Sequence, residues 1–464
     1  MIVCKFGGTS VGDADAIRRA AGIVRDRLDR QPIVVVSALG GATNVLIALA
    51  EQAARGQLIG ALRAVENLRD RHLKETAALL DGAPDLGEVT DELGGMFDEL
   101  ASLAEALSVL GHLTPRSLDA VAAFGEQLSS IMCAAAFRHA GLAAAHVDAR
   151  KVMITDDQFT RAEPQPEAIA EAARTHLVPL VRDGKVPVLG GYIGSSQKGG
   201  ITTTLGRGGS DYSASLIGAA LKADAIEIWT DVDGMLTADP RVVKHACMID
   251  QIGFEEASEL ASFGAKVLHP YTIAPAVRIG IPVCVLNSKK PAGKGTLITF
   301  DAPRRAVTAI AGKTAITLVK VRSPRMLLTE GFLREMFGVF ERHKVSVDVV
   351  ATSEVSVSVT VDDASALEEL MGELRQLGDV AIERHRGIVA LVGAALSEGG
   401  EAMSRALKAL GDTRLHMLSL SATGINLTMV VESDDVNPLM QRLHAEFFEG
   451  VADGETAVAA HSSA

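Results

Sequence analysis

The stretch KFGGTSVG at residues 5–12 follows a short apolar run and combines a lysine, glycines and two hydroxyl residues. Glycines let backbone N–H groups approach an oxyanion closely, and a helix N-terminus adds positive potential. We therefore expect a strand, a glycine turn and a helix beginning near Asp13, which together would cradle a phosphate. A Walker loop carries its lysine after the glycines, whereas Lys5 precedes them and should project from the strand end as a point charge. A glycine turn with a solvated lysine fits these eight residues equally well.

Length and composition indicate a soluble, folded protein. The 464 residues suffice for two to four domains, and 48% are hydrophobic and 22% charged. The net charge of -13 argues against nucleic acid or an anionic membrane as the main partner, because both reward a basic surface. We expect no secretory leader and no membrane-spanning run of apolar residues, and hence a cytoplasmic location.

The cysteines and histidines show no metal-binding pattern. Cys4, Cys133, Cys247 and Cys284 form no CxxC or CxH pair, so we expect buried thiols in a reducing compartment. No HExxH or related histidine spacing occurs. A protein-ligated transition metal is therefore not expected.

From residue 2 to about 301, short apolar runs alternate with longer helical stretches, which is typical of an α/β sandwich that binds ligands at its strand ends. Between residues 45 and 145, apolar residues recur every three or four positions, which predicts a helical subdomain. There, residues 82–88 should separate two helices, and Thr114-Pro115 should begin another. Buried strands that each run into a loop are expected at 33–41, 185–194, 225–234 and 281–288.

After Pro303 the pattern changes to strands and helices in the order βαββα, and a related order returns further on. The C-terminal third therefore reads as two small α/β modules, at 302–385 and 386–450, with paired ligand pockets. The alternation around Asp348 predicts a strand, and an acidic residue on a central strand is not explained by packing alone. Residues 451–464 are small and polar, and we expect them to be disordered.

A second glycine-rich stretch, TTTLGRGGSDYSA at 202–214, places Arg207 and Asp211 together just before a helix. Alone, it is better explained by an aspartate helix cap with a surface arginine. Glu126 lies in an otherwise apolar helical segment and should have a cationic partner, because an unpaired buried carboxylate is costly.

Two other strand ends carry polar residues. SALGGATN at 37–44 offers Ser37 and Thr43 as neutral donors, and TDVDG at 230–234 offers Thr230 and Asp231. Trp229 directly precedes this last stretch. We expect it to be a core residue whose fluorescence responds to nucleotide.

Six stretches occur in the order and spacing of the aspartate kinases: KFGGTSVG, SALGGATN, FGE, GRGGSDYSA, WTDVDGMLTADPR and FGAKVLHP. The chain resembles this family over nearly its whole length, and in particular monofunctional, lysine-sensitive members of the amino acid kinase superfamily. The resemblance implies a carbamate kinase-like α/β/α sandwich followed by two βαββαβ modules of the ACT type. It also implies transfer of the γ-phosphoryl group of MgATP to the side-chain carboxylate of L-aspartate, giving 4-phospho-L-aspartate, the first step of lysine, threonine and methionine biosynthesis.

The same resemblance assigns roles to individual residues. Catalysis is assigned to Lys5, Asp211 and Lys266. Aspartate would be bound by Ser37, Thr43, Glu126, Tyr192, Arg207, Ser210 and Asp211. ATP would be bound by Lys5, Gly7, Gly8, Thr230, Asp231, Arg241 and Lys266, with Mg²⁺ held mainly by phosphates and water. An amino-acid effector, with lysine as the candidate, would be bound at Met326, Gly331, Phe332, Ser346, Val347, Asp348, Thr352, Ser353 and Glu354. A homodimer or homotetramer through the ACT modules is implied.

The resemblance agrees with electrostatics. Because the aspartate side chain has a pKa near 3.9, it is ionised at pH 7 and needs no general base. The obstacle is repulsion between a carboxylate and a triphosphate, which local cations must offset. Leu236 replaces a frequent aromatic residue, and residues 328–330 replace a more polar, basic run of some lysine-inhibited members, so lysine and threonine both stay open as effectors. Two rival functions remain: a kinase for glutamate or N-acetylglutamate, and a catalytically inactive amino-acid sensor.

Overall fold

The computed structural model describes residues 1–206, 208–263, 270–327, 330–362 and 367–449. The chain forms two units, one comprising Met1–Met235 and Val267–Phe300 and the other Leu236–Lys266 and Asp301–Ala464. A segment that lies between two expected strands of the sandwich is thus grouped with the C-terminal part of the chain.

The first unit is built on a mainly parallel sheet. Its strands follow the order β3 (Ala144–His146), β5 (Val186–Gly190), β2 (Pro32–Val36), β1 (Ile2–Phe6), β8 (Ala225–Thr230), β10 (Val283–Asn287) and β11 (Thr296–Thr299). Only β11 runs antiparallel to its neighbour β10 within this set. All residues of β1 and β2 are buried, as expected for strands covered on both faces. A smaller sheet has the order β4 (Ile154–Thr155), β6 (Ile193–Ser196) and β7 (Thr202–Thr204).

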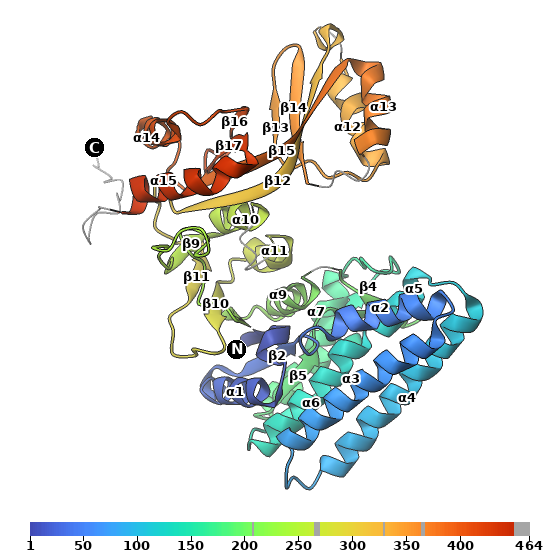
Figure 1. Ribbon diagram of the computed structural model, residues 1–464. Helices are drawn as coiled ribbons and strands as arrows, with labels where there is room; N and C mark the ends of the chain where they lie inside the picture. The colour runs from blue at the N-terminus through green and yellow to red at the C-terminus, as the bar shows by residue number, and fades with distance from the viewer. Residues whose placement is uncertain (207, 264–269, 328–329, 363–366, 450–464) are drawn as a thin grey trace. The chain divides into compact units, whose positions relative to one another are not determined.

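Helices surround this sheet, and two of them form a long antiparallel hairpin. The hairpin helices α3 (Leu58–Leu79) and α4 (Leu86–Leu110) run side by side in Figure 1, separated by the turn expected at residues 82–88. The Thr114 side chain accepts a hydrogen bond from the Ser117 backbone, which caps the next helix as expected. The remaining helices are α1 (Ala14–Arg25), α2 (Ala42–Ala54), α5 (Pro115–Ala122), α6 (Phe124–His139), α7 (Pro166–His176), α8 (Val178–Arg182), α9 (Gly209–Leu221) and α11 (Pro270–Arg278).

One helical stretch among the described residues, Pro115–His139, is long and apolar enough to cross a membrane by composition alone. In the fold, 89% of its most apolar window is buried. It is therefore a core helix of the first unit, and the side chains packed around it account for its hydrophobicity.

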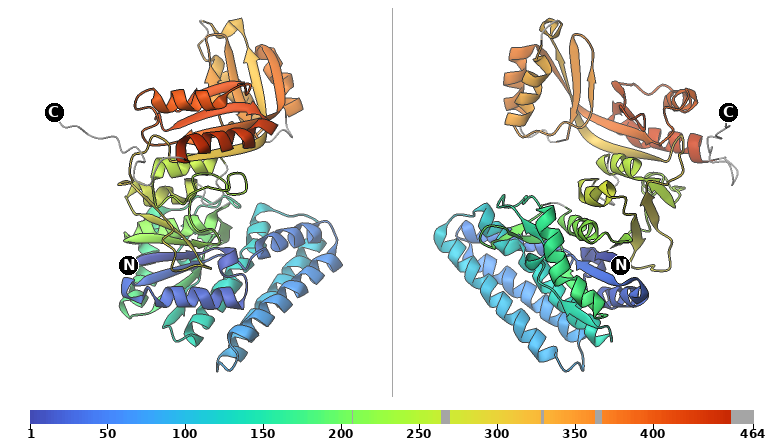
Figure 2. Two further views of the ribbon diagram at one scale, coloured as in Figure 1. Left: turned by 60° about the vertical axis from the view of Figure 1, so that its left-hand side comes forward. Right: turned by 180° about the vertical axis from the view of Figure 1, so that it is seen from behind.

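The second unit contains an antiparallel sheet with the strand order β13 (Val350–Thr352), β14 (Ser356–Val361), β12 (Ala309–Arg322), β15 (Asp379–Val392), β17 (Asn426–Glu432) and β16 (Met417–Leu420). Helices α12 (Phe332–Arg342) and α13 (Leu367–Leu377) lie side by side on one face of the β12–β14 half (Figures 1 and 2). The unit also contains β9 (Gln251–Gly253), α10 (Phe254–Ser262), α14 (Glu401–Leu410) and α15 (Val436–Phe448).

The two C-terminal repeats share this sheet, because β12 and β15 each extend through both. Residues 318–322 of β12 pair with 379–383 of β15, and residues 309–313 pair with 388–392. The register shifts between these two sets, near Ala315, which has a φ of 60°. Figure 2 shows both long strands, coloured yellow to orange. The strand 309–313 thus completes the second repeat although it precedes the first in sequence, so the repeats are interleaved and not consecutive.

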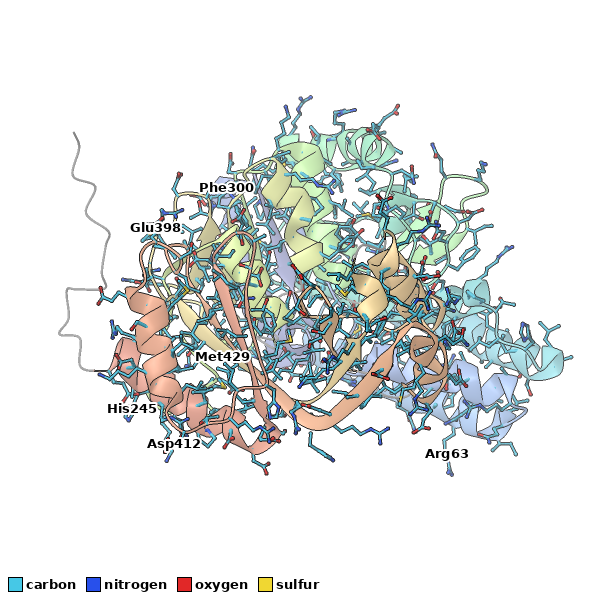
Figure 3. The ribbon with its side chains drawn as sticks, turned by 90° about the horizontal axis from the view of Figure 1, so that it is seen from above. Arg63, His245, Phe300, Glu398, Asp412 and Met429 are labelled. Atoms are coloured by element: carbon cyan, nitrogen blue, oxygen red, sulfur yellow. The ribbon has the colours of Figure 1, made fainter. Side chains whose placement is uncertain are left out.

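We call residues 316–383 the first module, and residues 309–313 with 386–449 the second module. Each has its own core. The first packs Val319, Phe340 and Leu370 between its sheet and its two helices. The second packs other buried side chains, among them Met429, whose position is marked in Figure 3 together with the exposed Asp412. Figure 3 also marks Arg63, which is exposed on α3 of the first unit.

Two expectations about single residues are wrong. Asp348 does not lie on a central strand: it precedes β13, which is an edge strand of the sheet. Cys247 is exposed rather than buried, whereas Cys4 and Cys133 are buried as expected and Cys284 is partly buried.

Candidate active site

A cavity of about 670 Å³ lies at the carboxyl ends of β1 and β2 in the first unit. This is where a parallel sheet is expected to bind its ligand. Eight of the residues expected to bind substrate line it: Lys5, Gly8, Ser37, Thr43, Glu126, Tyr192, Ser210 and Asp211.

Lys5 is the cation at the floor of this cavity. Its ammonium nitrogen lies 2.6 Å from Oδ1 of Asp211, and the two side chains are only 10% and 15% exposed. The contact is an ion pair without the alignment of a hydrogen bond. Asp211 does not cap its helix, because Gly208 occupies the N-cap position of α9. The alternatives of a solvated lysine and an aspartate helix cap are therefore both wrong.

Glu126 is almost fully buried near Lys5 and has one unsatisfied oxygen. Its Oε1 accepts the backbone N–H of Ala38 at 3.1 Å, while Oε2 has no hydrogen-bond partner in the described part of the chain. Burial raises the pKa of Glu126 to about 8, although the Ala38 hydrogen bond and the charge of Lys5 act to lower it. No described cation forms an ion pair with Glu126, although the charge of Lys5 acts on it. An ammonium group from a ligand would satisfy the free oxygen.

Two glycines allow the far wall of the cavity to form. A Cβ on Gly191 would lie 2.7 Å from Cα of Ser210, and a Cβ on Gly209 would lie 2.7 Å from Cδ2 of Tyr192. Tyr192 itself has a φ of 64°, and its backbone N–H is bonded to the Ser213 hydroxyl. These close approaches hold the tyrosine ring and the start of α9 against each other, so either glycine should resist substitution.

The glycine turn after β1 is fixed by the end of β8. The N–H of Gly7 donates to the carbonyl oxygen of Trp229 at 3.0 Å, so this N–H is not available to a phosphate as expected. Gly8 lies so close to the next loop that a Cβ on it would be 3.0 Å from the Ala38 carbonyl oxygen. A phosphate bound at this turn could therefore not use the Gly7 N–H.

A pair of buried serines joins the glycine turn to two strands. The hydroxyls of Ser10 and Ser288 are 2.8 Å apart. The Ser10 hydroxyl also donates to the Trp229 carbonyl oxygen at 3.2 Å, and Ser288 contacts the Thr230 carbonyl oxygen through both its hydroxyl and its backbone N–H. The turn, β8 and β10 are thus tied together beneath the expected nucleotide site. Nothing in the local sequence around Ser288 predicted this contact.

Beyond Trp229, the end of β8 carries Thr230 and the exposed Asp231, neither of which lines the 670 Å³ cavity. Trp229 is fully buried, stacks on Phe6 and donates its indole N–H to Glu227 at 3.1 Å. The prediction that this tryptophan belongs to the core is confirmed.

Comparison with known proteins identifies the family. Residues 1–287 match the profile of the Amino acid kinase family. Lysine-sensitive aspartokinase 3 of Escherichia coli (strain K12) is 40% identical over 97% of this chain and 99% of its own length. The chain belongs to the aspartokinase family. Aspartokinase 3, chloroplastic, of Arabidopsis thaliana is 34% identical over 96% of the chain and 81% of its own length.

Two solved aspartokinase structures are similar to nearly the whole chain. The crystal structure of E. coli aspartokinase III in complex with aspartate and ADP, in its R-state, has a TM-score of 0.82 at 40% identity, covering 97% of this chain and all of that one. The T-state complex of the same enzyme with lysine and aspartate has a TM-score of 0.81. The sequence-based identification and the amino acid kinase fold with C-terminal ACT-type modules are confirmed. This aspartokinase is an ATP-dependent phosphotransferase that acts on the side-chain carboxylate of aspartate.

Among the described residues expected at the aspartokinase site, Gly7, Thr230, Asp231 and Arg241 do not line the cavity. Arg207 and Lys266 lie outside the described residues. Arg241 belongs to the second unit, where its exposed guanidinium forms an ion pair with Asp239 at 2.6 Å.

The residues expected to bind an effector lie around the start of α12 and along residues 346–354 in the first module. Phe332 is buried in the module core, so it could meet an effector only through its backbone. Asp348 is contacted by the Lys313 ammonium at 3.3 Å, and burial raises the pKa of the Asp348 carboxyl with help from neighbouring Asp362. The others are Met326, Gly331, Ser346, Val347, Thr352, Ser353 and Glu354, all of which are partly or fully exposed. Gly331 is the N-cap of α12 and has a φ of 87°.

Sequence reasoning missed one wall of the aspartokinase cavity. Leu118 and Asp119 on α5, together with Thr160 and Arg161 before α7, also line it. The loop around Arg161 has no periodic pattern and no glycine cluster, so it gave no recognisable signal.

Proposed function

We propose that the 670 Å³ cavity is the site where L-aspartate is phosphorylated, with its side-chain carboxylate facing the phosphoryl group at Lys5. The observation that carries this proposal is the buried Lys5–Asp211 ion pair beside the unsatisfied oxygen of Glu126. The E. coli relative, whose structure matches 97% of this chain, was crystallised with aspartate and ADP.

The reaction requires charge stabilisation rather than proton abstraction. Aspartate enters with an ionised side chain and can attack phosphorus directly. Lys5 then offsets the negative charge on the phosphoryl oxygens as the carboxylate approaches. Asp211 holds the Lys5 ammonium in one position, so little reorganisation is needed in the transition state.

The acceptor's other groups also have partners here. The free oxygen of Glu126 suits the α-ammonium group, and Arg207 is proposed for the α-carboxylate because a guanidinium binds a carboxylate with two parallel bonds. Neutral contacts and a wall would come from Ser37, Thr43, Tyr192 and Ser210.

The nucleotide would lie toward Gly8 and the end of β8, with Thr230 and Asp231, and we propose Arg241 and Lys266 as further nucleotide contacts. Mg²⁺ would be carried by phosphate oxygens and water, which suits a cavity whose Asp211 is already paired with Lys5.

The test is an ATP-dependent assay in which hydroxylamine traps the acyl phosphate, run with aspartate, glutamate and N-acetylglutamate. We expect the wild-type chain to turn over aspartate and Lys5→Ala to lose at least about a hundredfold in kcat, as for loss of a transition-state charge contact. Lys185→Ala removes an exposed lysine outside the cavity and should leave kcat unchanged. Preference for glutamate, or no turnover at all, would refute the assignment.

We further propose that lysine binds the first module and inhibits by favouring a less active arrangement. The effector's side-chain ammonium would be held by Glu354 or by Asp348, in the latter case in competition with Lys313. Activity should fall with lysine at millimolar concentration. Titrations with lysine, threonine and both distinguish the effectors, and unchanged activity in lysine would reject this part.

A homodimer or homotetramer through the ACT-type modules is also proposed, because β13 and β16 are edge strands that commonly pair between subunits. Sedimentation measurements would test it. We also propose a cytoplasmic location.

A further inference from the structure

Asp119 organises the cavity wall formed by α5 and the turn before α7. This side chain on α5 is 1% exposed, and its carboxylate accepts three hydrogen bonds. They come from the backbone N–H of Thr160 at 2.8 Å, the backbone N–H of Thr204 at 3.0 Å and the Thr204 hydroxyl at 2.7 Å. One buried carboxylate thus joins a helix, strand β7 and the turn before α7.

The turn so held is strained. Thr160 has a φ of 70°, a conformation that is unfavourable for a β-branched residue. Its N–H is fixed by Asp119, and two residues later the N–H of Ala162 donates to the Thr204 carbonyl oxygen at 2.9 Å. Such strain persists only where the surrounding contacts determine the conformation, and it clusters at functional sites.

The strained turn places Arg161 on the cavity wall. The aliphatic stem of Arg161 lies near Gly206, where an added Cβ would be 3.7 Å from its Cγ. Arg161 therefore lies beside Gly206, and it lines the same cavity as Lys5 and Glu126.

Two cations of the described residues line the cavity, Lys5 and Arg161, and they differ in their partners. Lys5 is paired with Asp211, and Asp119 accepts three hydrogen bonds from Thr160 and Thr204. Arg161 makes no ion pair with any carboxylate of the described residues, although it lines a cavity with three acids. The neighbouring turn, held by Asp119, fixes the position of Arg161, and its guanidinium remains available to a ligand.

We propose that Arg161 binds the non-reacting carboxylate of the amino acid acceptor, and that Asp119 is the positioning residue that holds Arg161 there. This inference rests on the proposed function, because it requires a dicarboxylic acceptor in this cavity. A guanidinium at this carboxylate makes the site selective for acceptors that carry both negative charges.

The first experiment compares Arg161→Gln with Arg116→Gln. Arg116 is exposed on the same helix as Asp119 but does not line the cavity, so both variants change the net charge equally. Arg161→Gln should raise the KM for aspartate about tenfold or more and leave the KM for ATP within about twofold. Arg161→Lys should fall between, because lysine keeps the charge but loses the two-pronged geometry.

The α-amide of aspartate supplies a sharper readout. It keeps the reacting carboxylate and lacks the other negative charge, so the wild-type chain should prefer aspartate over it. Arg161→Gln should reduce that preference about tenfold, which a general loss of folding would not do. An unchanged preference, or a KM equal to that of Arg116→Gln, overturns the proposal. Since the wild-type chain must phosphorylate aspartate in the same assay, failure of the proposed function would be seen separately.

A double-mutant cycle tests the role of Asp119. Asp119→Asn should raise the KM for aspartate, and adding it to Arg161→Gln should raise that KM no further, because both changes remove one contact. If the two substitutions each raised the KM by their own factor in the double variant, Asp119 would act independently of Arg161, and its positioning role would be rejected. Thr204→Val, which removes only one of the three donors, gives the same comparison if Asp119→Asn unfolds.

Discussion

At the scale of single residues, Glu126 shows how the fold prepares a site for its ligand. A carboxyl group with one bonded and one unsatisfied oxygen is costly in a buried place. In the ligand-free chain that cost is reduced by protonation, since the pKa is about 8. An incoming ammonium favours the ionised form, so substrate binding and loss of this proton are coupled.

This coupling predicts a pH-dependent affinity for aspartate. Below pH 8 the free chain holds the proton on Glu126, which must leave before an ammonium can bind. The KM for aspartate should therefore fall up to about tenfold per pH unit as pH rises toward 8, and level off above it. Steady-state kinetics between pH 6 and 8.5 measure this. In Glu126→Gln the KM should be high and nearly independent of pH, and a wild-type KM that is flat over this range would contradict the expectation.

At the scale of elements, the nucleotide side depends on how β1, β8 and β10 are tied at their carboxyl ends. The Ser10–Ser288 pair and the Trp229 carbonyl oxygen determine where the glycine turn lies. These contacts touch no proposed ligand, but they fix the N–H groups that would.

Ser10→Ala should therefore raise the KM for ATP more than that for aspartate. Loss of one buried hydroxyl costs about 1 kcal/mol, which corresponds to about fivefold. Ser102→Ala removes the same group from the exposed face of α4 and serves as the control. Kinetics with each substrate varied in turn distinguish the effects, and equal changes in both KM values would indicate general destabilisation instead.

The sequence predicted the elements whose signals are local. Lys5, the glycine turn and the helix capped by Asp13 follow one another within a few residues, and each was placed correctly. Asp119 carries no such signal, because its partners Thr160 and Thr204 lie 41 and 85 residues away. The sequence likewise predicts consecutive repeats, whereas the structure interleaves them. Residues 309–313 and 388–392 are far apart in the chain, so their pairing is visible only in the folded sheet.

At the scale of the whole molecule, the two modules depend on strands they share. At the point where β15 passes from one module to the other, Gly387 packs against α15, and an added Cβ would lie 2.1 Å from Cγ2 of Val436. The passage between modules has no space for a side chain there.

Gly387→Ala should consequently destabilise the second unit by about 2 kcal/mol, as overpacking does. Gly372→Ala is the matched control: its Cβ would meet nothing within 4 Å on helix α13, so it should stabilise by about 0.5–1 kcal/mol. Urea unfolding followed by circular dichroism measures both. Equal stability of the two variants would show that the passage tolerates rearrangement.

The shared sheet also limits how regulation can be exchanged between enzymes. Cutting the chain between residues 383 and 386 does not free the second module intact. Its strand 388–392 pairs with residues 309–313, which lie on the other side of the cut. The contact of Thr237 with His444 ties a still earlier segment to the same body. Chimaeras that transplant feedback control must therefore carry residues 236–263 and 301–449 as one discontinuous cassette.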